Sequence, residues 1–442
     1  MLRESRSVPA AGLGFGVAVG FVVLGLSVGP DAPLPPLVGG LLEGGTPPTV
    51  EALRSELEPA PDSLGHRTAI EDPTGHALDA VHAALRDAER GQGQARLLFY
   101  GGSHTAGDHY TGRMREALQS TFGDAGHGFV NLAPIVTNQW RWGMVLDAAE
   151  GWETLKPGFK ARDVDRYGVA GAAFQSDEAG AFAALSSDHW GNGREASRLE
   201  LHYDRIPGGG SLEVWIDGRR VETLETDQDT PAGARAIYDV SDTTHRMEVR
   251  VVGDGPVRAY GFVFERARPG VLVDNLGLVG SKARLQLLWD EPLWRQHFES
   301  RRPDLIALAY GNNEATDTHL TIAQHEAHLR RVMDRLESAA PDASCLLIGP
   351  TDRPRERDDG ALEPRPVIAD LTEMQRRVAF DRGCGFFDTL AFQGGLGASL
   401  VWLANDPPYM RDDRQHLTRQ GYRRWGEELT RALLEGYRST DD

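Results

Sequence analysis

The stretch that most restricts the fold of this chain is Leu97-Leu98-Phe99-Tyr100-Gly101-Gly102-Ser103-His104-Thr105. A short, continuous apolar run of this kind is typical of a strand buried on both faces of a parallel sheet. The two glycines allow a sharp turn and let another group approach Ser103 closely. Open α/β sheets bind ligands at the carboxyl ends of their strands. The stretch therefore predicts an α/β fold, with Ser103 either at a reaction site or, on the plainer interpretation, in an ordinary polar loop.

A carboxylate and an imidazole near the C-terminus are the partners that a reactive serine needs. Asp413 precedes His416 by three residues, so both side chains can lie on one turn. A carboxylate beside a histidine fixes its tautomer and stabilises the imidazolium that forms when the ring takes a serine proton. Asp412 is one residue further from His416 and is the weaker candidate for this role.

A second apolar run, Leu305-Ile306-Ala307-Leu308-Ala309, leads into Tyr310-Gly311-Asn312-Asn313-Glu314. It has the same pattern of a buried strand that ends in glycine and polar side chains. An amide at this place can donate a hydrogen bond to an oxyanion that develops during acyl transfer. We therefore expect Asn313 to lie at the same edge of the sheet as Ser103.

These motifs resemble those of the SGNH (GDSL-type) hydrolase family. The matching blocks are Gly101–Ser103, Gly311–Glu314 and Asp413–His416. A closer resemblance, to the bacterial peptidoglycan O-acetylesterase branch, runs through residues 100–108, 122–129, 274–280 and 310–315. It covers the chain from about Glu71 to the C-terminus.

The resemblance implies a flavodoxin-like three-layer α/β fold and a catalytic triad of Ser103, His416 and Asp413. It also implies an oxyanion hole made by the backbone N–H groups of Ser103 and Gly280 and by the Asn313 amide. For Gly280 the alternative is a plain tight turn. The implied activity is the removal of O-acetyl groups from a cell-wall glycan such as peptidoglycan, through an acyl-enzyme and without a cofactor or metal.

The chain departs from the family pattern at two positions. Gly102 stands where the family has an aspartate before the serine, and Glu314 stands where it has an aspartate after the asparagine. The first departure puts the catalytic rate in doubt. Two alternatives therefore stay open: a glycan O-acetyltransferase that uses the same triad, and a catalytically weak protein that only binds glycan.

Three further candidate strands complete a sheet of five parallel strands with helices between them: Leu272–Leu276, Ser344–Ile348 and Gly385–Asp388. A last helix is expected from about Arg419, because apolar side chains recur there at helical spacing. We assign residues 71–135 and 269–442 to the hydrolase domain.

Residues 136–268 show a different pattern, with alternating apolar residues and turn signals such as Asp217-Gly218. This predicts an inserted β-sandwich (jelly-roll-like) domain. In the related branch the module resembles a carbohydrate-binding domain, and a purely structural lid is the competing interpretation.

The N-terminal region is expected to direct the protein to a membrane. Residues 8–29 are uncharged and largely apolar and follow Arg3 and Arg6, which predicts a signal anchor or transmembrane segment within residues 1–29. Residues 30–70 are rich in proline and glycine and are expected to be a linker, with a short helix at Val50–Leu57. The body would then lie in the periplasm, anchored in the inner membrane. The formal net charge of −18 argues against nucleic acid as a partner.

Other polar and aromatic clusters favour structural interpretations. Asn138, Trp140 and Trp142 suit a sugar-facing wall, but packing at a domain junction is preferred. We expect His319, His325 and His328 to lie on a solvated helix face, and Asp227 and Asp229 in a polar turn, rather than at a metal. The two cysteines, Cys345 and Cys384, are more often buried thiols in such positions, and the sequence does not establish a disulfide.

Overall fold

The computed structural model describes residues 47–60, 63–136, 141–158, 165–187 and 191–439. The predicted anchor at residues 8–29 and two of the predicted wall residues, Asn138 and Trp140, lie outside these ranges. Among the described residues, no helix is both long and apolar enough to cross a membrane.

The central sheet contains all five of the predicted parallel strands. They are β2 (Gln94–Gly101), β14 (Gly270–Gly277), β15 (Leu305–Ala309), β16 (Ser344–Ile348) and β19 (Gly385–Phe387). Their spatial order is β19-β16-β15-β2-β14, which is the 2-1-3-4-5 order of flavodoxin-like folds. A two-residue antiparallel strand, β1 (Ile70–Glu71), adds to the β19 edge. It was not predicted, because two residues carry no periodic signal.

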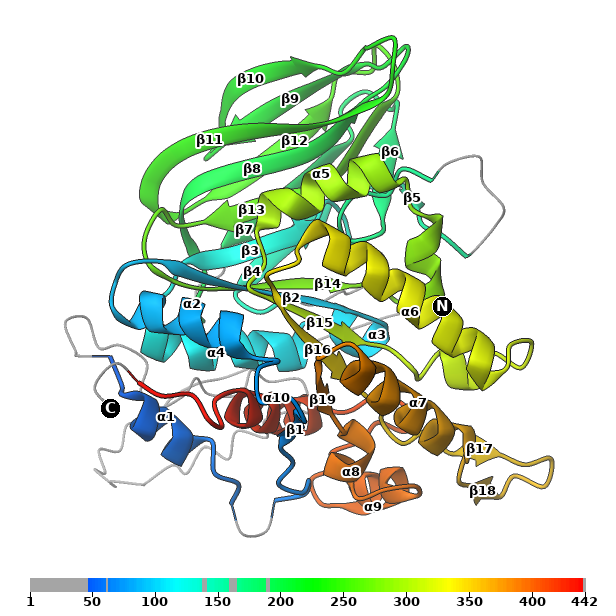
Figure 1. Cartoon of the computed structure of the whole chain (residues 1–442). Coiled ribbons are helices and arrows are strands. Elements are labelled where there is room, and N and C mark those ends of the chain that lie inside the picture. The colour runs from blue at the N-terminus through cyan, green and yellow to red at the C-terminus, as the bar shows by residue number, and fades with distance from the viewer. Residues whose placement is uncertain (1–46, 61–62, 137–140, 159–164, 188–190, 440–442) are drawn as a thin grey trace, which may run out of the picture. The chain divides into compact units, whose positions relative to one another are not determined.

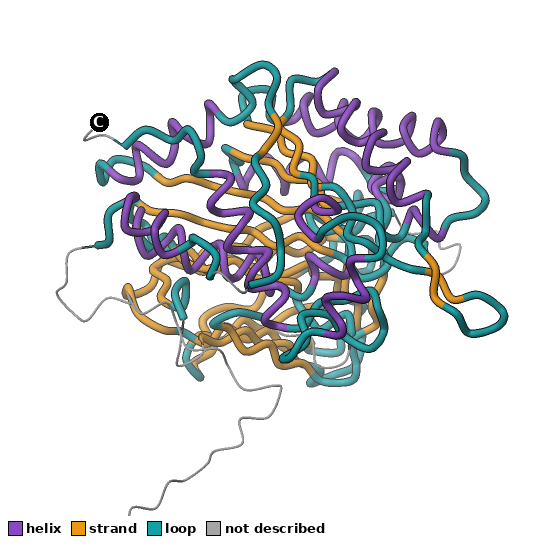
Figure 2. The backbone as a smooth tube through the Cα atoms, turned by 90° about the horizontal axis from the view of Figure 1, so that it is seen from below, coloured by secondary structure: helices purple, strands orange, loops and turns teal. Residues whose placement is uncertain are grey.

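Alternate residues of β2 enter two different hydrophobic clusters, so the strand is buried on both faces as predicted. Leu97 and Phe99 pack with one cluster, and Leu98 and Tyr100 with the other. Helices on both sides of the central sheet also contribute side chains to these clusters (Figures 1 and 2). The first cluster receives side chains from α1 (Val50–Glu56), α2 (Asp79–Glu89), α4 (His109–Phe122) and α10 (Arg419–Leu433). The second receives them from α5 (Glu291–Arg301), α6 (Ile322–Ala339) and α7 (Val367–Asp381).

Helix α1 belongs to the folded body, although its residues fall in the predicted linker. Val50 and Leu53 are buried in the first cluster, and the Arg54 guanidinium donates to the carbonyl of Leu434 at 3.1 Å. The boundary placed at residue 71 therefore lies inside the folded body. The sequence signal was weak because a helix of seven residues spans barely two turns.

Two antiparallel sheets are formed by the chain between α4 and β14. One has the order β10-β9-β12-β7-β4 and the other β11-β8-β13-β6-β5. Their strands are β4 (Met144–Ala148), β5 (Glu153–Leu155), β6 (Ala173–Ser176), β7 (Phe182–Ser187), β8 (Glu195–Arg205), β9 (Ser211–Ile216), β10 (Arg219–Glu225), β11 (Ala232–Thr244), β12 (Arg246–Val251) and β13 (Val257–Glu265). A third hydrophobic cluster contains side chains from both sheets. Strand β3 (Gly126–Asn131) pairs with β13, so the chain joins these sheets before residue 136.

The remaining elements are short and lie mostly in the loops of the hydrolase part. They are α3 (Ser103–Ala106), α8 (Thr389–Gln393), α9 (Ala398–Ala404), the 3₁₀ helices η1 (Ala283–Leu288) and η2 (Glu314–Thr316), and the hairpin strands β17 (Arg355–Glu356) and β18 (Leu362–Glu363).

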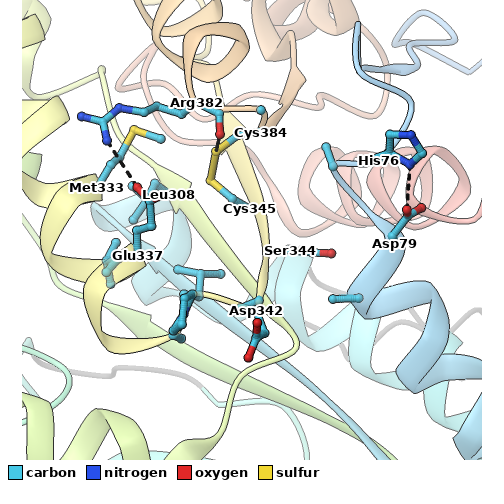
Figure 3. A pocket seen from close by; sticks show the side chains of 18 residues that line it. His76, Asp79, Leu308, Met333, Glu337, Asp342, Ser344, Cys345, Arg382 and Cys384 are labelled. Carbon is cyan, nitrogen blue, oxygen red and sulfur yellow. Dashed lines mark hydrogen bonds and ion pairs between the residues drawn. A yellow bond between two sulfur atoms is a disulfide. The ribbon is translucent and has the colours of Figure 1, made fainter.

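A disulfide joins Cys345 of β16 to Cys384, which directly precedes β19. The preference for two buried thiols was wrong, because adjacent parallel strands bring these residues to a Cα–Cα distance of 4.8 Å. The disulfide borders a pocket of about 340 Å³ (Figure 3). Ser344 and Ala343, which line this pocket, lie at the amino end of β16, whereas Ser103 follows the carboxyl end of β2. This pocket is therefore at the opposite end of the central strands from Ser103.

We expect the disulfide to stabilise the fold by restricting the unfolded chain. It closes a loop with a sequence separation of 39 residues, for which loop-closure entropy predicts about 4 kcal/mol. The double variant Cys345→Ala/Cys384→Ala should therefore unfold at a lower urea concentration than the wild type. Reductant should lower the wild-type midpoint and leave that of the double variant unaltered. Equal midpoints for both proteins in oxidising buffer would contradict a stabilising disulfide.

Candidate active site

Ser103 is the first residue of α3 and follows β2 directly. The structure brings it together with the two residues predicted to be its partners. Oγ of Ser103 lies 2.8 Å from Nε2 of His416, and Nδ1 of His416 lies 2.6 Å from Oδ2 of Asp413. In the tautomer with the proton on Nδ1, the serine hydroxyl donates to Nε2 and the imidazole donates to the carboxylate. This arrangement lets His416 accept the serine proton while Asp413 stabilises the resulting charge.

The turn from Asp413 to His416 is fixed by its own backbone. Oδ1 of Asp413 accepts from the N–H groups of Gln415 and His416 at 3.0 and 2.8 Å. Burial alone would raise the pKa of this carboxyl, but these N–H groups and the imidazole outweigh it and hold the pKa below its usual value. Arg414 adopts a positive φ of 55°, which closes the turn. Asp412 makes no hydrogen bond with another described residue, so Asp413 is the partner of the ring.

Asn313 lines the same small pocket as Ser103. Its Nδ2 donates to the carbonyl of Ser281 at 2.8 Å, and both residues line a small pocket with Gly102 and Ser103. One of the two amide hydrogens is used by this bond, which leaves the second for another acceptor. Gly280 directly precedes Ser281 in an exposed turn with a φ of 76°. Its predicted role in an oxyanion hole stays a prediction.

Glu314 joins the loops that follow β14 and β15. Its carboxylate is buried and accepts from the backbone N–H groups of Ala283 at 2.8 Å and Gly311 at 2.9 Å. Burial raises the pKa of this carboxyl, and the N–H groups partly oppose that shift. The two bonds set Asn313 against Ser281. The longer side chain of glutamate thus performs a structural task at the position where the family has aspartate.

A buried network behind α3 was not assigned a role from the sequence. Nδ2 of Asn275 donates to the carbonyl of Thr105 at 2.5 Å and to Oγ1 of Thr111 at 2.7 Å. Asp108, which has a positive φ of 52°, accepts from Thr111 and from the guanidinium of Arg115. Burial opposes ionisation of Asp108, but Arg115 and neighbouring cations dominate and hold its pKa far below the usual range. These contacts hold the helix that begins at Ser103.

His104 packs against His416, with 5.3 Å between the ring centroids. Its Nδ1 is hydrogen bonded to the Tyr422 hydroxyl at 3.0 Å. Burial, aided by the nearby charge of His416, lowers the pKa of His104 to about 3. The ring is therefore neutral at ordinary pH and adds no positive charge to compete with a protonated His416.

The other clusters singled out in the sequence lie elsewhere. Trp142 packs against Gly112 of α4, and its backbone N–H donates to the Asp108 carboxylate at 3.0 Å, which agrees with packing at a junction. His325 is only 6% exposed, so the expectation of a solvated face was wrong for this residue; it lies on the buried side of α6 with Leu329 and Val332. Asp227 accepts from the backbone of Gly208 in a turn. Within the described ranges, no group of three or more acidic, histidine or cysteine side chains is arranged to hold a metal ion.

Residues 241–424 match the model of the GDSL-like Lipase/Acylhydrolase family. This match supports an esterase of the GDSL type. Its fold is similar to that of a solved peptidoglycan O-acetylesterase, with a TM-score of 0.69 and 22% identity over 83% of this chain and 99% of that chain. At this identity the likeness concerns the fold alone.

Two other solved structures match with lower TM-scores. A family two carbohydrate esterase from Clostridium thermocellum has a TM-score of 0.28 and 10% identity, over 66% of this chain and 99% of that chain. An acetyl xylan esterase has a TM-score of 0.28 and 22% identity, over 36% of this chain and 78% of that chain. Neither score supports a conclusion. A comparison with curated proteins found no match.

We predict that Glu314→Gln lowers the free energy of unfolding of this esterase by about 1–3 kcal/mol. A glutamine has one acceptor oxygen where the carboxylate uses two, so one buried backbone N–H loses its partner. Urea unfolding measures the change. Glu225→Gln, at an exposed position of β10, is the matched control and should change stability by less than about 0.5 kcal/mol. Equal stability of both variants would show that Glu314 does not hold the two loops.

Proposed function

We propose that this esterase removes O-acetyl groups from a cell-wall glycan such as peptidoglycan. The observation that carries the proposal is the hydrogen-bonded series of Ser103, His416 and Asp413 beside the amide of Asn313. The fold likeness to a peptidoglycan O-acetylesterase supports the choice of glycan. We interpret the two antiparallel sheets as one inserted β-sandwich domain, whose part in glycan binding belongs to the same proposal.

The reaction follows from the positions of these groups. Oγ of Ser103 attacks the acetyl carbonyl carbon while Nε2 of His416 takes the hydroxyl proton. The oxyanion accepts hydrogen bonds from the Asn313 amide and, by the same proposal, from the N–H groups of Ser103 and Gly280. The bond to the sugar oxygen then breaks, and His416 returns the proton to that oxygen. Water attacks the acetyl-serine with His416 again as the base, and acetate leaves.

The location remains a proposal as well. An oxidising compartment is where a structural disulfide forms and persists, and Cys345 and Cys384 form one here. Together with the apolar segment at residues 8–29, this supports export to the periplasm with an anchor in the inner membrane.

Ser103 and Asn313 can be tested by their effect on ester hydrolysis. The protein should hydrolyse 4-nitrophenyl acetate and release acetate from O-acetylated peptidoglycan, and Ser103→Ala should abolish both activities. Asn313→Ala should lower kcat by about a hundredfold to a thousandfold, because it removes one oxyanion donor. Circular dichroism checks that both variants are folded. Unchanged turnover in Asn313→Ala would remove the amide from the mechanism.

The same assay separates the two alternatives. Acetylated product formed from 4-nitrophenyl acetate and an unacetylated glycan would identify a transferase, because a sugar hydroxyl would replace water as the acceptor. A folded wild-type protein that binds glycan but hydrolyses neither substrate would identify a glycan-binding protein.

Because Gly102 has no side chain, the Asn313 amide can lie close to its Cα atom. A Cβ atom built at residue 102 would lie 2.9 Å from Nδ2 of Asn313, closer than such atoms normally approach. We therefore predict that Gly102→Ala lowers kcat by displacing the amide, and that Gly102→Asp, which introduces the family residue, does not raise it. Steady-state hydrolysis of 4-nitrophenyl acetate measures both. Gly93→Ala, at a glycine outside the left-handed region where a Cβ would meet only Asp87 Cβ at 3.3 Å, controls for a general effect of replacing a glycine. Faster turnover in Gly102→Asp would mean that the missing aspartate limits this enzyme.

A further inference from the structure

Arg353 lies in the loop after β16, next to the loop that carries the candidate oxyanion residues. Its Nη1 donates to the carbonyl of Asn312 at 3.0 Å. The side chain of Asn312 in turn donates to Oγ1 of Thr351 at 2.8 Å. These bonds fasten the two loops together and hold one nitrogen of the guanidinium. Asn312 also lines the small pocket at Ser103, so Arg353 is attached directly to the wall of the site.

The positive charge of Arg353 has no carboxylate partner among the residues that the structure describes. The same holds for Arg365, whose Nε donates to the carbonyl of Arg353 at 3.3 Å. Both side chains are partly buried. Many buried arginines elsewhere in the described chain have such a partner: Arg96 pairs with Glu265, and Arg301 with Asp274. Two adjacent guanidinium groups without one are unusual in a chain with a net charge of −18.

The charges around Arg353 also indicate that its guanidinium is poorly compensated. Burial and the neighbouring charge of Arg365 lower the pKa of Arg353, and only the carboxylate of Asp413 opposes them. That carboxylate already accepts from His416. The charge of Arg353 also contributes to the lowered pKa of His104, which packs against His416. Arg353 is therefore near the triad, and its charge is poorly compensated.

The sheet order explains why Arg353 is near the triad. β2, β15 and β16 are consecutive neighbours in the central sheet. The loops at their carboxyl ends carry Ser103, Asn313 and Arg353 respectively. A substrate whose acetyl group lies between Ser103 and Asn313 has its remaining atoms next to the third loop. A neutral donor would suffice to hold the Asn312 carbonyl, whereas a planar guanidinium is suited to bind a carboxylate through two parallel hydrogen bonds.

We propose that Arg353 is a specificity-determining residue that binds a carboxylate carried by the acetylated sugar or by a substituent directly attached to it. The inference rests on the proposed function and narrows its substrate to anionic glycans. The free N–H groups of the guanidinium bind the carboxylate, and Arg365 adds to the positive potential. An acetylated neutral sugar lacks this interaction.

The test compares two substrates that differ in one charged group. They are 6-O-acetyl-N-acetylmuramic acid, which carries a lactyl carboxylate, and 6-O-acetyl-N-acetylglucosamine, which is neutral. The wild type should show the higher kcat/KM for the anionic sugar. Arg353→Gln should lower the ratio of the two kcat/KM values by about ten- to a hundredfold, because a charge-assisted hydrogen bond is lost. Glutamine can still donate to the Asn312 carbonyl, so this variant tests the charge rather than the loop contact.

Arg302→Gln is the matched control. Arg302 is exposed and precedes the amino end of β15, at the opposite edge of the sheet. The Arg302→Gln variant loses the same charge and should keep the wild-type ratio of the two kcat/KM values. A fall of equal size for both substrates in Arg353→Gln would overturn the proposal, because it would assign Arg353 to loop structure alone.

A binding experiment keeps this inference separate from the proposed activity. Ser103→Ala and Ser103→Ala/Arg353→Gln are titrated with unacetylated N-acetylmuramic acid and N-acetylglucosamine, and binding is measured by NMR. Tighter binding of the anionic sugar that depends on Arg353 supports the inference even if no ester is hydrolysed. Equal affinities in both proteins would overturn it even if the esterase activity is real. Galacturonic acid in the same titration tells whether the carboxylate must be on a lactyl group or on the sugar ring; binding of either one through Arg353 supports the proposal.

Discussion

The register of three parallel strands determines where the reacting groups lie. Gly101, the last residue of β2, is paired with Gly277 of β14 on one side and with Ala309 of β15 on the other. Three loops therefore leave the sheet at the same level, and they carry Ser103, Ser281 and Asn313. A slip in either pairing would separate the serine from the amide. The positions of these side chains therefore depend first on the backbone hydrogen bonds of the central sheet.

Charged side chains buried under these loops hold them in place. Glu314 joins the loops after β14 and β15 through two backbone N–H groups, and Asp108 with Asn275 holds the helix that starts at Ser103. Burying a charge is costly unless it is paired and hydrogen bonded. Both carboxylates meet this condition with several donors, so their role is to orient the backbone. His416 reaches the serine from outside this group, on a turn that bonds from its backbone and that of Gln415 to Asp413 stabilise.

The sequence predicted the parts of the molecule whose signal is local. The five central strands are apolar runs bounded by turn residues, and the spacing of Asp413 and His416 follows from a single turn. Contacts between distant segments left no such signal. The burial of α1 depends on its packing with α10 and α4, and the burial of His325 depends on which face of α6 meets the sheet. The disulfide depends on the neighbouring positions of β16 and β19, which the sequence order alone does not fix. Arg353 carries no motif, and its lack of a carboxylate partner among the described residues depends on how the loops after β15 and β16 meet.

Groups at the amino ends of the central strands are paired within the protein, whereas groups at the carboxyl ends keep unused hydrogen-bonding capacity. Near the amino ends of the strands, the two cysteines are joined in a disulfide, and Arg96 and Arg301 are each paired with a carboxylate of the protein itself. At the carboxyl edge, groups are left with unused hydrogen-bonding capacity: one hydrogen of the Asn313 amide and the free nitrogens of the Arg353 guanidinium. Both residues are half-buried, so water can reach these groups in the free protein. A substrate with an ester carbonyl and a carboxylate supplies partners for both and displaces that water. Under the proposed function, these two groups therefore orient the glycan.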